Sequence, residues 1–169
     1  MSAFDRPVDR AARMFTWLFL GCLLIIAAAL VLQFGYRLDP CPWCVAQRIV
    51  YLLIALVALG AALWRPVARG ITVFSMIGLV FALTGVAAAT WHVFLQRDPE
   101  RANACAGSML EQLLDASRLA HWVPPLFQYD GPCTLKPWSL LGMSVPEWSL
   151  AGFAVIALYC LILPFIARR

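Results

Sequence analysis

Four long apolar runs constrain the fold of this chain more than any other feature. The first, at residues 14–34, has no charged residue in 21 positions. As a helix rising about 1.5 Å per residue, it matches the ~30 Å hydrocarbon core of a bilayer. Similar runs lie at about 45–64, 71–95 and 145–166, with Arg48 and Glu147 near the starts of two of them. Backbone polar groups in lipid must be paired within the segment, so runs of this length predict membrane-spanning helices.

The overall composition supports a membrane protein. Hydrophobic residues make up 63% of the 169 residues and charged residues 13%, against about 45–50% and 25% in soluble domains. The prediction is an all-α membrane protein, with a single four-transmembrane-helix domain over residues 1–169. Its basic residues flank the apolar runs and form no patch of their own, so nucleic-acid binding is not expected.

The distribution of basic residues predicts the orientation in the membrane. Seven of them lie in the short tail before residue 14, the turn at 65–70 and the C-terminal end. The longer connections at 35–44 and 96–144 together carry five. By the positive-inside rule, both termini are expected in the cytoplasm and both longer connections in the periplasm of a bacterial inner membrane.

The second periplasmic connection contains a further helical pattern. Residues 108–122 place most apolar side chains on one helical face and most polar ones on the other, which predicts a short interfacial helix lying on the bilayer. Pro124 and Pro125 are expected to end it.

The six cysteines separate by depth. Cys22 and Cys160 lie inside predicted spans without polar neighbours, where a cysteine behaves as a small hydrophobic residue. Cys41 and Cys44 form a Cys-Pro-Trp-Cys motif at the start of the second span, and Cys-x-x-Cys pairs are often redox-active. Cys105 and Cys133 lie in the long connection on the same predicted side. These four cysteines are therefore expected to face the oxidising compartment, where disulfides persist.

The start of the second span favours thiolate chemistry at the Cys-x-x-Cys motif. Pro42 suits the first position of a helix, and the helix dipole there stabilises negative charge on a sulfur. Arg48 lies one helical turn beyond Cys44 on the same face. It could stabilise the Cys44 thiolate or an anionic oxygen of a bound acceptor; alternatively, it extends to the lipid headgroups.

Cys105 and Cys133 lie 28 residues apart in the long periplasmic connection. A redox pair and a structural staple of the loop are both consistent with this spacing. A four-cysteine zinc site is disfavoured because only one short Cys-x-x-Cys spacing is present, so no metal is expected.

Three polar residues fall at similar depth near the periplasmic surface: Gln33 at the end of the first span, Gln47 beside Arg48, and His92 near the end of the third. They could line one pocket, in which His92 would donate a hydrogen bond to a quinone carbonyl. An aromatic belt with a hydrogen-bonded histidine is the simpler interpretation.

The combined pattern resembles the bacterial disulfide bond formation protein B (DsbB) family of membrane quinone reductases. The resemblance covers the whole chain: four spans, a short and then a long periplasmic loop, and Cys-x-x-Cys followed by Arg48. It extends to Cys105 and to the residues around Cys133, namely Val123-Pro124-Pro125 and Gly131-Pro132-Cys133. Gln47 departs from the acidic residue that members of the family often carry before the arginine.

The resemblance implies a path for electrons. A reduced DsbA-like periplasmic oxidase would attack a Cys105–Cys133 disulfide at Cys105, forming a mixed disulfide. Cys133 would then attack Cys41 of the Cys41–Cys44 disulfide, and the Cys44 thiolate would donate to ubiquinone or menaquinone. Arg48, Cys44, His92 and Gln33 are the implied quinone-binding residues.

Other functions remain open on the sequence alone. A non-catalytic scaffold with a disulfide-stapled loop is the main alternative from a different class. A vitamin K epoxide reductase-like protein is disfavoured, because its Cys-x-x-Cys lies late in the bundle. An ion transporter is disfavoured because the spans carry almost no ionisable residues at mid-depth.

Overall fold

The protein is a bundle of four long helices, seen in a computed structural model that describes residues 7–98, 109–133 and 139–168. The long helices are α1 (Pro7–Gly35), α2 (Pro42–Trp64), α3 (Ala68–Arg97) and α7 (Val145–Arg168). Each contains one of the predicted spans, and each is long and apolar enough to cross a membrane. The sequence prediction of an all-α bundle of four membrane helices is therefore confirmed.

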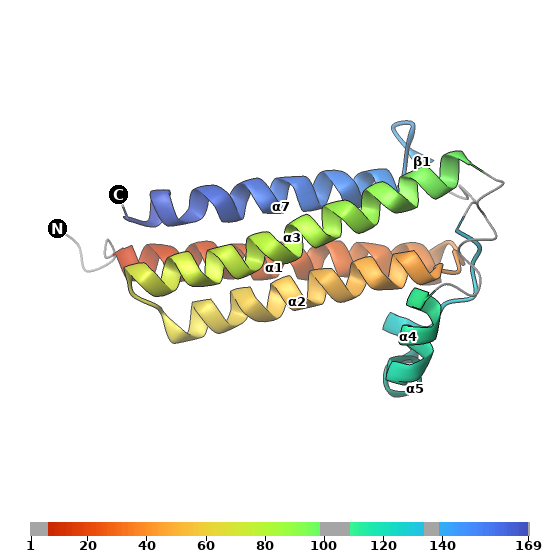
Figure 1. Cartoon of the computed structure of the whole chain (residues 1–169), viewed down its shortest axis with the longest axis horizontal. Helices are drawn as coiled ribbons and strands as arrows, with labels where there is room; N and C mark the ends of the chain where they lie inside the picture. Colours follow the sequence, from red (N-terminus) through yellow and green to blue (C-terminus); the bar gives the residue numbers. More distant parts are fainter. Residues whose placement is uncertain (1–6, 99–108, 134–138, 169) are drawn as a thin grey trace.

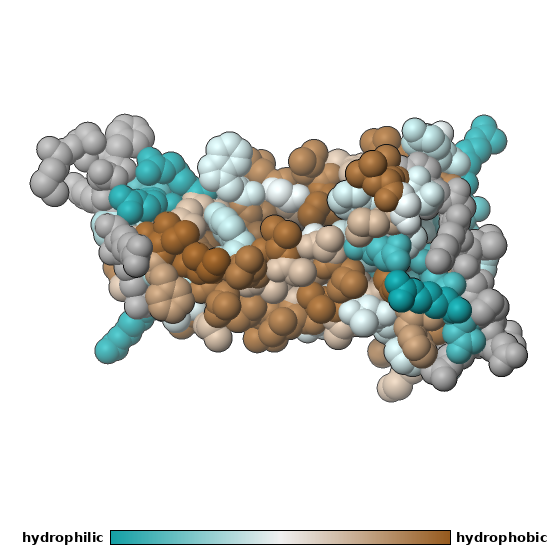
Figure 2. Space-filling view, turned by 90° about the horizontal axis from the view of Figure 1, so that it is seen from above, coloured by the Kyte–Doolittle hydropathy of each residue, from teal (hydrophilic) through white to brown (hydrophobic). Residues whose placement is uncertain are grey.

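The surface has the polarity that a bilayer requires. An apolar band covers the middle of the face shown in Figure 2, and hydrophilic residues gather toward its two ends. Large apolar side chains are exposed on the long helices, among them Trp17, Leu24, Val80 and Phe165. Such exposure would be unfavourable in water and is what lipid-facing positions require. The chain is a multi-pass membrane protein.

Close packing of small residues joins α3 to α7. A Cβ atom added to Gly85 would lie 2.3 Å from a ring carbon of Phe153, and one added to Gly78 would lie 3.1 Å from Cys160 Sγ. Phe153 is fully buried and stacks on Tyr51 of α2, with ring centroids 4.0 Å apart. Small residues allow membrane helices to approach this closely. Cys22 and Cys160 are both buried in this core as free thiols, in agreement with their predicted structural role.

Three short helices and a hairpin lie at the end of the bundle opposite the two termini (Figure 1). They are α4 (Met109–Ser117), α5 (Leu119–Trp122), α6 (Pro124–Phe127), and the antiparallel pair β1 (Ser139–Leu140) and β2 (Met143–Ser144). The two-residue turn Leu141-Gly142 has positive φ at both positions, as tight hairpins require. This hairpin is not predictable from the sequence pattern, because strands of two residues carry no detectable alternation.

The predicted helix over residues 108–122 is broken within the described part of the loop. Arg118 has a left-handed backbone, with φ of 53°, and separates α4 from α5. Pro124 and Pro125 then begin α6, since proline suits the first turn of a helix. Figure 1 shows α4 and α5 extending away from the bundle rather than along its axis.

The contact between Gly85 and Phe153 predicts a measurable loss of stability. Gly85→Ala should lower the free energy of unfolding by about 1–3 kcal/mol, because the added methyl group overpacks the contact between α3 and α7. Thermal unfolding in detergent would measure the change. Gly21→Ala is the matched control, since nothing lies within 4 Å of the added Cβ there. Equal stability of the two variants would contradict the packing argument.

Candidate redox site at the start of the second helix

The site is built around the first turn of α2. Cys41 is the N-cap residue and Pro42 the first residue of the helix, as the sequence predicts. The Cys44 backbone N–H donates to Cys41 Sγ at 3.4 Å, so the cap itself orients one of the two sulfurs. The motif therefore lies at the positive end of the helix dipole, where negative charge on sulfur is stabilised.

The two sulfurs of the motif are free thiols in contact. Cys41 Sγ donates to Cys44 Sγ across 3.3 Å. The pKa of the Cys41 thiol is raised above its ordinary value, because its proton is held in this hydrogen bond and because the side chain is buried. Cys41 therefore keeps its proton, and Cys44 is the sulfur better placed to carry negative charge.

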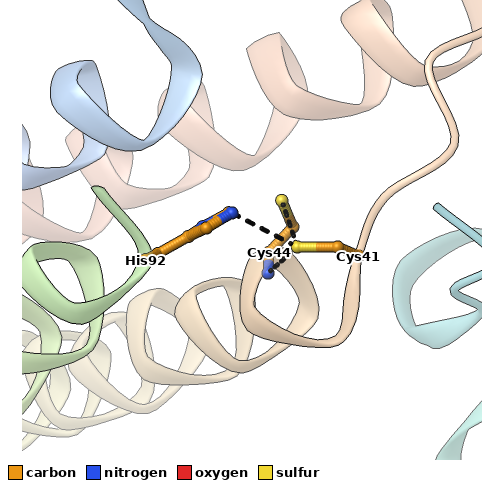
Figure 3. A group of neighbouring side chains, drawn as sticks. All are labelled: Cys41, Cys44 and His92. Carbon is orange, nitrogen blue, oxygen red and sulfur yellow. Dashed lines mark hydrogen bonds between the residues drawn. The ribbon is translucent and has the colours of Figure 1, made fainter. Parts of the chain in front are cut away.

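His92 of α3 reaches the same pair of sulfurs (Figure 3). Its Nε2 atom lies 3.4 Å from Cys41 Sγ, and its Nδ1 atom lies 3.2 Å from Nε2 of Gln47. Both polar side chains are buried, at 2% and 5% exposure. His92 is thus held between a sulfur and an amide, a placement that its position near the end of α3 could not reveal.

Arg48 is buried and directed toward α1. Its Nη1 atom donates to Gln33 Oε1 at 2.7 Å and to the Leu126 carbonyl at 3.4 Å. A buried guanidinium is costly unless its N–H groups are paired, and these two acceptors supply partners. With 7% exposure, the Arg48 side chain is held within the protein, which favours a role at the site over extension to the lipid headgroups.

The end of the long loop is clamped onto the first loop by backbone contacts. The N–H groups of Asp130 and Gly131 donate to the Pro40 carbonyl at 3.2 and 3.1 Å. A Cβ atom at Gly131 would lie 2.1 Å from the Asp39 carbonyl oxygen, so only glycine fits this crossing. The Gly131 contact was not evident from the sequence, where Asp130-Gly131-Pro132 indicates only a turn.

The clamp holds Cys133 beside Cys41. Both side chains are 3% exposed and share a small buried cluster with Leu95 of α3. Cys133 is disulfide-bonded. Its predicted partner, Cys105, lies outside the described residues. One bonded cysteine of the long loop therefore packs against one free cysteine of the Cys-x-x-Cys motif.

A long apolar groove leads away from these sulfurs between α1 and α7. Its volume is about 880 Å³. Apolar residues such as Gly21, Ile25 and Val155 line it, and Cys44, Arg48, Gln33 and His92 border its polar end. The groove exists because α1 and α7 pack against each other far less extensively than either α1 and α2 or α3 and α7.

The comparison with known proteins agrees with this chemistry. The family model described as disulfide bond formation protein DsbB matches residues 11–163. Disulfide bond formation protein B 2 of Burkholderia lata is 39% identical over 134 residues, covering 79% of this chain and 76% of that protein. Disulfide bond formation protein B of Aromatoleum aromaticum is 35% identical over 156 residues, covering 92% of both chains. The chain therefore belongs to the disulfide bond formation protein DsbB family and is a disulfide-generating membrane oxidoreductase.

Proposed function

We propose that the protein reoxidises a periplasmic DsbA-like dithiol oxidase and passes the electrons through two disulfides to a membrane quinone, ubiquinone or menaquinone. The observation that carries this proposal is the position of the Cys41 and Cys44 thiols, 3.3 Å apart between the clamped Cys133 and the polar end of the apolar groove. Cys133 lies on one side of the pair and can exchange disulfides with it, and the groove lies on the other side and can hold an apolar acceptor.

The donor side works by thiol–disulfide exchange. The partner's thiolate attacks a Cys105–Cys133 disulfide at Cys105, and the released Cys133 thiolate attacks Cys41 of an oxidised Cys41–Cys44 pair. Cys44 leaves as a thiolate, and the helix dipole and the Arg48 charge favour it as the leaving group. The partner's other thiol then attacks the partner's own sulfur in the mixed disulfide, which releases the oxidised partner and frees Cys105 as a thiolate. Cys105 then displaces Cys41 from Cys133, which restores the loop disulfide and leaves Cys41 and Cys44 reduced.

The thiol states in the structure correspond to one stage of this sequence. Cys133 is disulfide-bonded, whereas Cys41 and Cys44 are free thiols. In the proposed sequence, this combination of thiol states belongs to the stage after exchange with the partner, when the motif holds two electrons. The raised pKa of Cys41 keeps one proton in the Cys41–Cys44 hydrogen bond, with Cys44 as the acceptor.

The groove supports a quinone as the acceptor. Its polar end supplies hydrogen-bond donors from Arg48, and its apolar walls suit an isoprenoid chain. Arg48 and Gln33 would hold the head group beside Cys44, and His92 would hold the Cys41 sulfur. A quinone bound there supplies a two-electron, two-proton acceptor, so that the Cys41–Cys44 disulfide can re-form.

The membrane topology fits the same scheme. Both termini and the turn between α2 and α3 lie at one end of the bundle (Figure 1). The start of α2, the helices α4 and α5, and the hairpin with β1 lie at the other end. The excess of basic residues at the terminal end supports a cytoplasmic location for it. The apolar side chains Met109 and Leu113 are exposed on α4, which supports its placement in the bilayer interface.

The Cys44→Ser and Cys105→Ser variants should each lose a different step of the reaction. Cys44→Ser should abolish quinone reduction, because no sulfur then faces the acceptor. Cys105→Ser should block turnover with the protein donor but leave quinone bound. Anaerobic quinone absorbance with a reduced DsbA-like donor would measure both. Wild-type turnover in Cys105→Ser would refute the loop relay. No reduction by folded, oxidised wild type with either quinone would instead favour a stapled scaffold.

Arg48 should control quinone affinity. Arg48→Ala should raise the apparent KM for quinone about 10-fold or more, since a hydrogen bond to a charged group contributes about 1.5–3 kcal/mol. Arg48→Lys keeps the charge but loses the planar fork, and an intermediate KM is expected. The measurement is quinone reduction at a fixed donor concentration. An unchanged KM in Arg48→Ala would remove the assigned role.

Gly131 should control the exchange between the two disulfides. Gly131→Ala forces the loop away from the Asp39 carbonyl, so quinone reduction driven by the protein donor should slow about 10-fold. With Cys105→Ser added and dithiothreitol as the direct reductant of Cys41–Cys44, Gly131→Ala should have no effect. Gly35→Ala is the matched control, because its nearest contact is an ordinary 4.0 Å. Equal slowing with both donors would argue against a relay role.

A further inference from the structure

We propose that the reduced Cys41–Cys44 pair and His92 form a binding site for a thiophilic divalent cation, Zn²⁺ or Cd²⁺, and that this cation arrests the enzyme in its reduced state. The ligand atoms of these three residues all lie within 4.8 Å of one another. Figure 3 shows the three side chains converging from the start of α2 and from α3. Two thiolates and an imidazole are a common ligand set for zinc.

The distances already approach those of a tetrahedral site. Bonds of about 2.3 Å to sulfur and 2.0–2.1 Å to nitrogen place two sulfur ligands about 3.8 Å apart and a sulfur and a nitrogen about 3.6 Å apart. The corresponding separations here are 3.3 Å for Cys41 to Cys44 and 3.4 Å for Cys41 to His92. These two pairs need to separate by only a few tenths of an ångström, while the ligand atoms of Cys44 and His92 lie within 4.8 Å of each other. A solvent molecule can complete the fourth position.

Gln47 supplies the outer support that a histidine ligand requires. To bind a cation through Nε2, the neutral His92 ring must carry its proton on Nδ1. The Gln47 amide nitrogen lies 3.2 Å from Nδ1. Flipping this amide when the cation binds would place its oxygen there to accept that proton. A partner of this kind fixes the ring orientation and raises the basicity of the ligand.

Charged groups around the site also favour a cation. The carboxylate residues Asp39 and Asp130 line the same groove as Cys41 and Cys44, and they border a second pocket at its mouth. Two thiolate ligands neutralise the charge of one divalent cation, so the nearby Arg48 guanidinium faces a neutral cation–dithiolate unit.

The site depends on the redox state without any redox step of its own. The Cys41–Cys44 disulfide lacks the two thiolates, so the oxidised enzyme cannot bind the cation through this set. In the reduced enzyme, the cation holds both sulfurs that must form the disulfide.

The test is a titration of the purified, reduced protein with Cd²⁺ under anaerobic conditions in detergent. The protein should carry Cys105→Ser and Cys133→Ser, which remove the loop thiols. The thiolate-to-cadmium charge-transfer absorption should rise until one equivalent of Cd²⁺ has been added per protein and then stay constant. Added Zn²⁺ should displace the cadmium and remove the absorption. The same protein after oxidation of Cys41 and Cys44 should show no absorption. Cys22 and Cys160 remain throughout and act as internal controls, because both are buried.

Variants then test each ligand. Cys41→Ser with Cys44→Ser should abolish the signal, His92→Ala should weaken binding at least 10-fold, and Gln47→Leu should weaken it about 10-fold. Absence of the signal in the reduced protein, or its persistence without Cys41 and Cys44, would overturn the site. Unchanged cadmium affinity in His92→Ala would mean that the two thiolates alone bind the cation, and it would overturn the three-ligand assignment.

Arrest is measured separately with wild-type enzyme. Saturating Zn²⁺, added to reduced enzyme before quinone, should slow reoxidation of the Cys41–Cys44 pair at least 10-fold, and a chelator should restore the rate. Binding without slowing would overturn the arrest. Since the titration contains neither donor nor quinone, its outcome does not depend on the proposed electron path.

Discussion

Uneven packing among the four long helices is the constraint on which the rest of the structure depends. Gly78 and Gly85 let α3 lie directly against Cys160 and Phe153 of α7, and α1 packs closely along α2. These two tight pairs leave a weak seam between α1 and α7, where the groove lies. A bundle packed equally on all sides would enclose the Cys-x-x-Cys motif in protein and leave no apolar path to it.

The polar end of the groove is held together by buried groups that satisfy one another. Arg48 reaches across to Gln33 of α1 and to the Leu126 carbonyl of α6, while Gln47 turns to His92 of α3. Consecutive residues of α2 therefore connect three different elements. An unpaired polar group at this depth would cost several kcal/mol, so these pairings also set the helix orientations around the sulfurs.

The sulfur chemistry depends on a contact between two loops rather than on the helices alone. The Pro40 carbonyl accepts from Asp130 and Gly131, and Cys133 follows two residues later. The Pro40 carbonyl precedes Cys41 directly, so the crossing places Cys133 beside Cys41, the two cysteines between which we propose disulfide exchange. The absence of a side chain at Gly131 is what permits the approach. On the other side of Cys41, the His92 ring lies 3.4 Å from the sulfur. His92 therefore belongs both to the surroundings of the redox thiols and to the candidate cation site.

Three features are predictable from the sequence alone: the membrane class, the four helices and the placement of the Cys-x-x-Cys motif at the start of α2. These follow from hydropathy, length and proline chemistry, which are local properties of the chain. Arg48 and Gln33 could be selected as site residues because a polar side chain in an apolar span demands a partner. The tertiary structure alone decided that they pair with each other, that His92 meets Cys41 from 51 positions away, and that Gly131 crosses the Asp39–Pro40 backbone. These contacts depend on the rotation of each helix about its axis and on the path of the long loop, which no local pattern specifies.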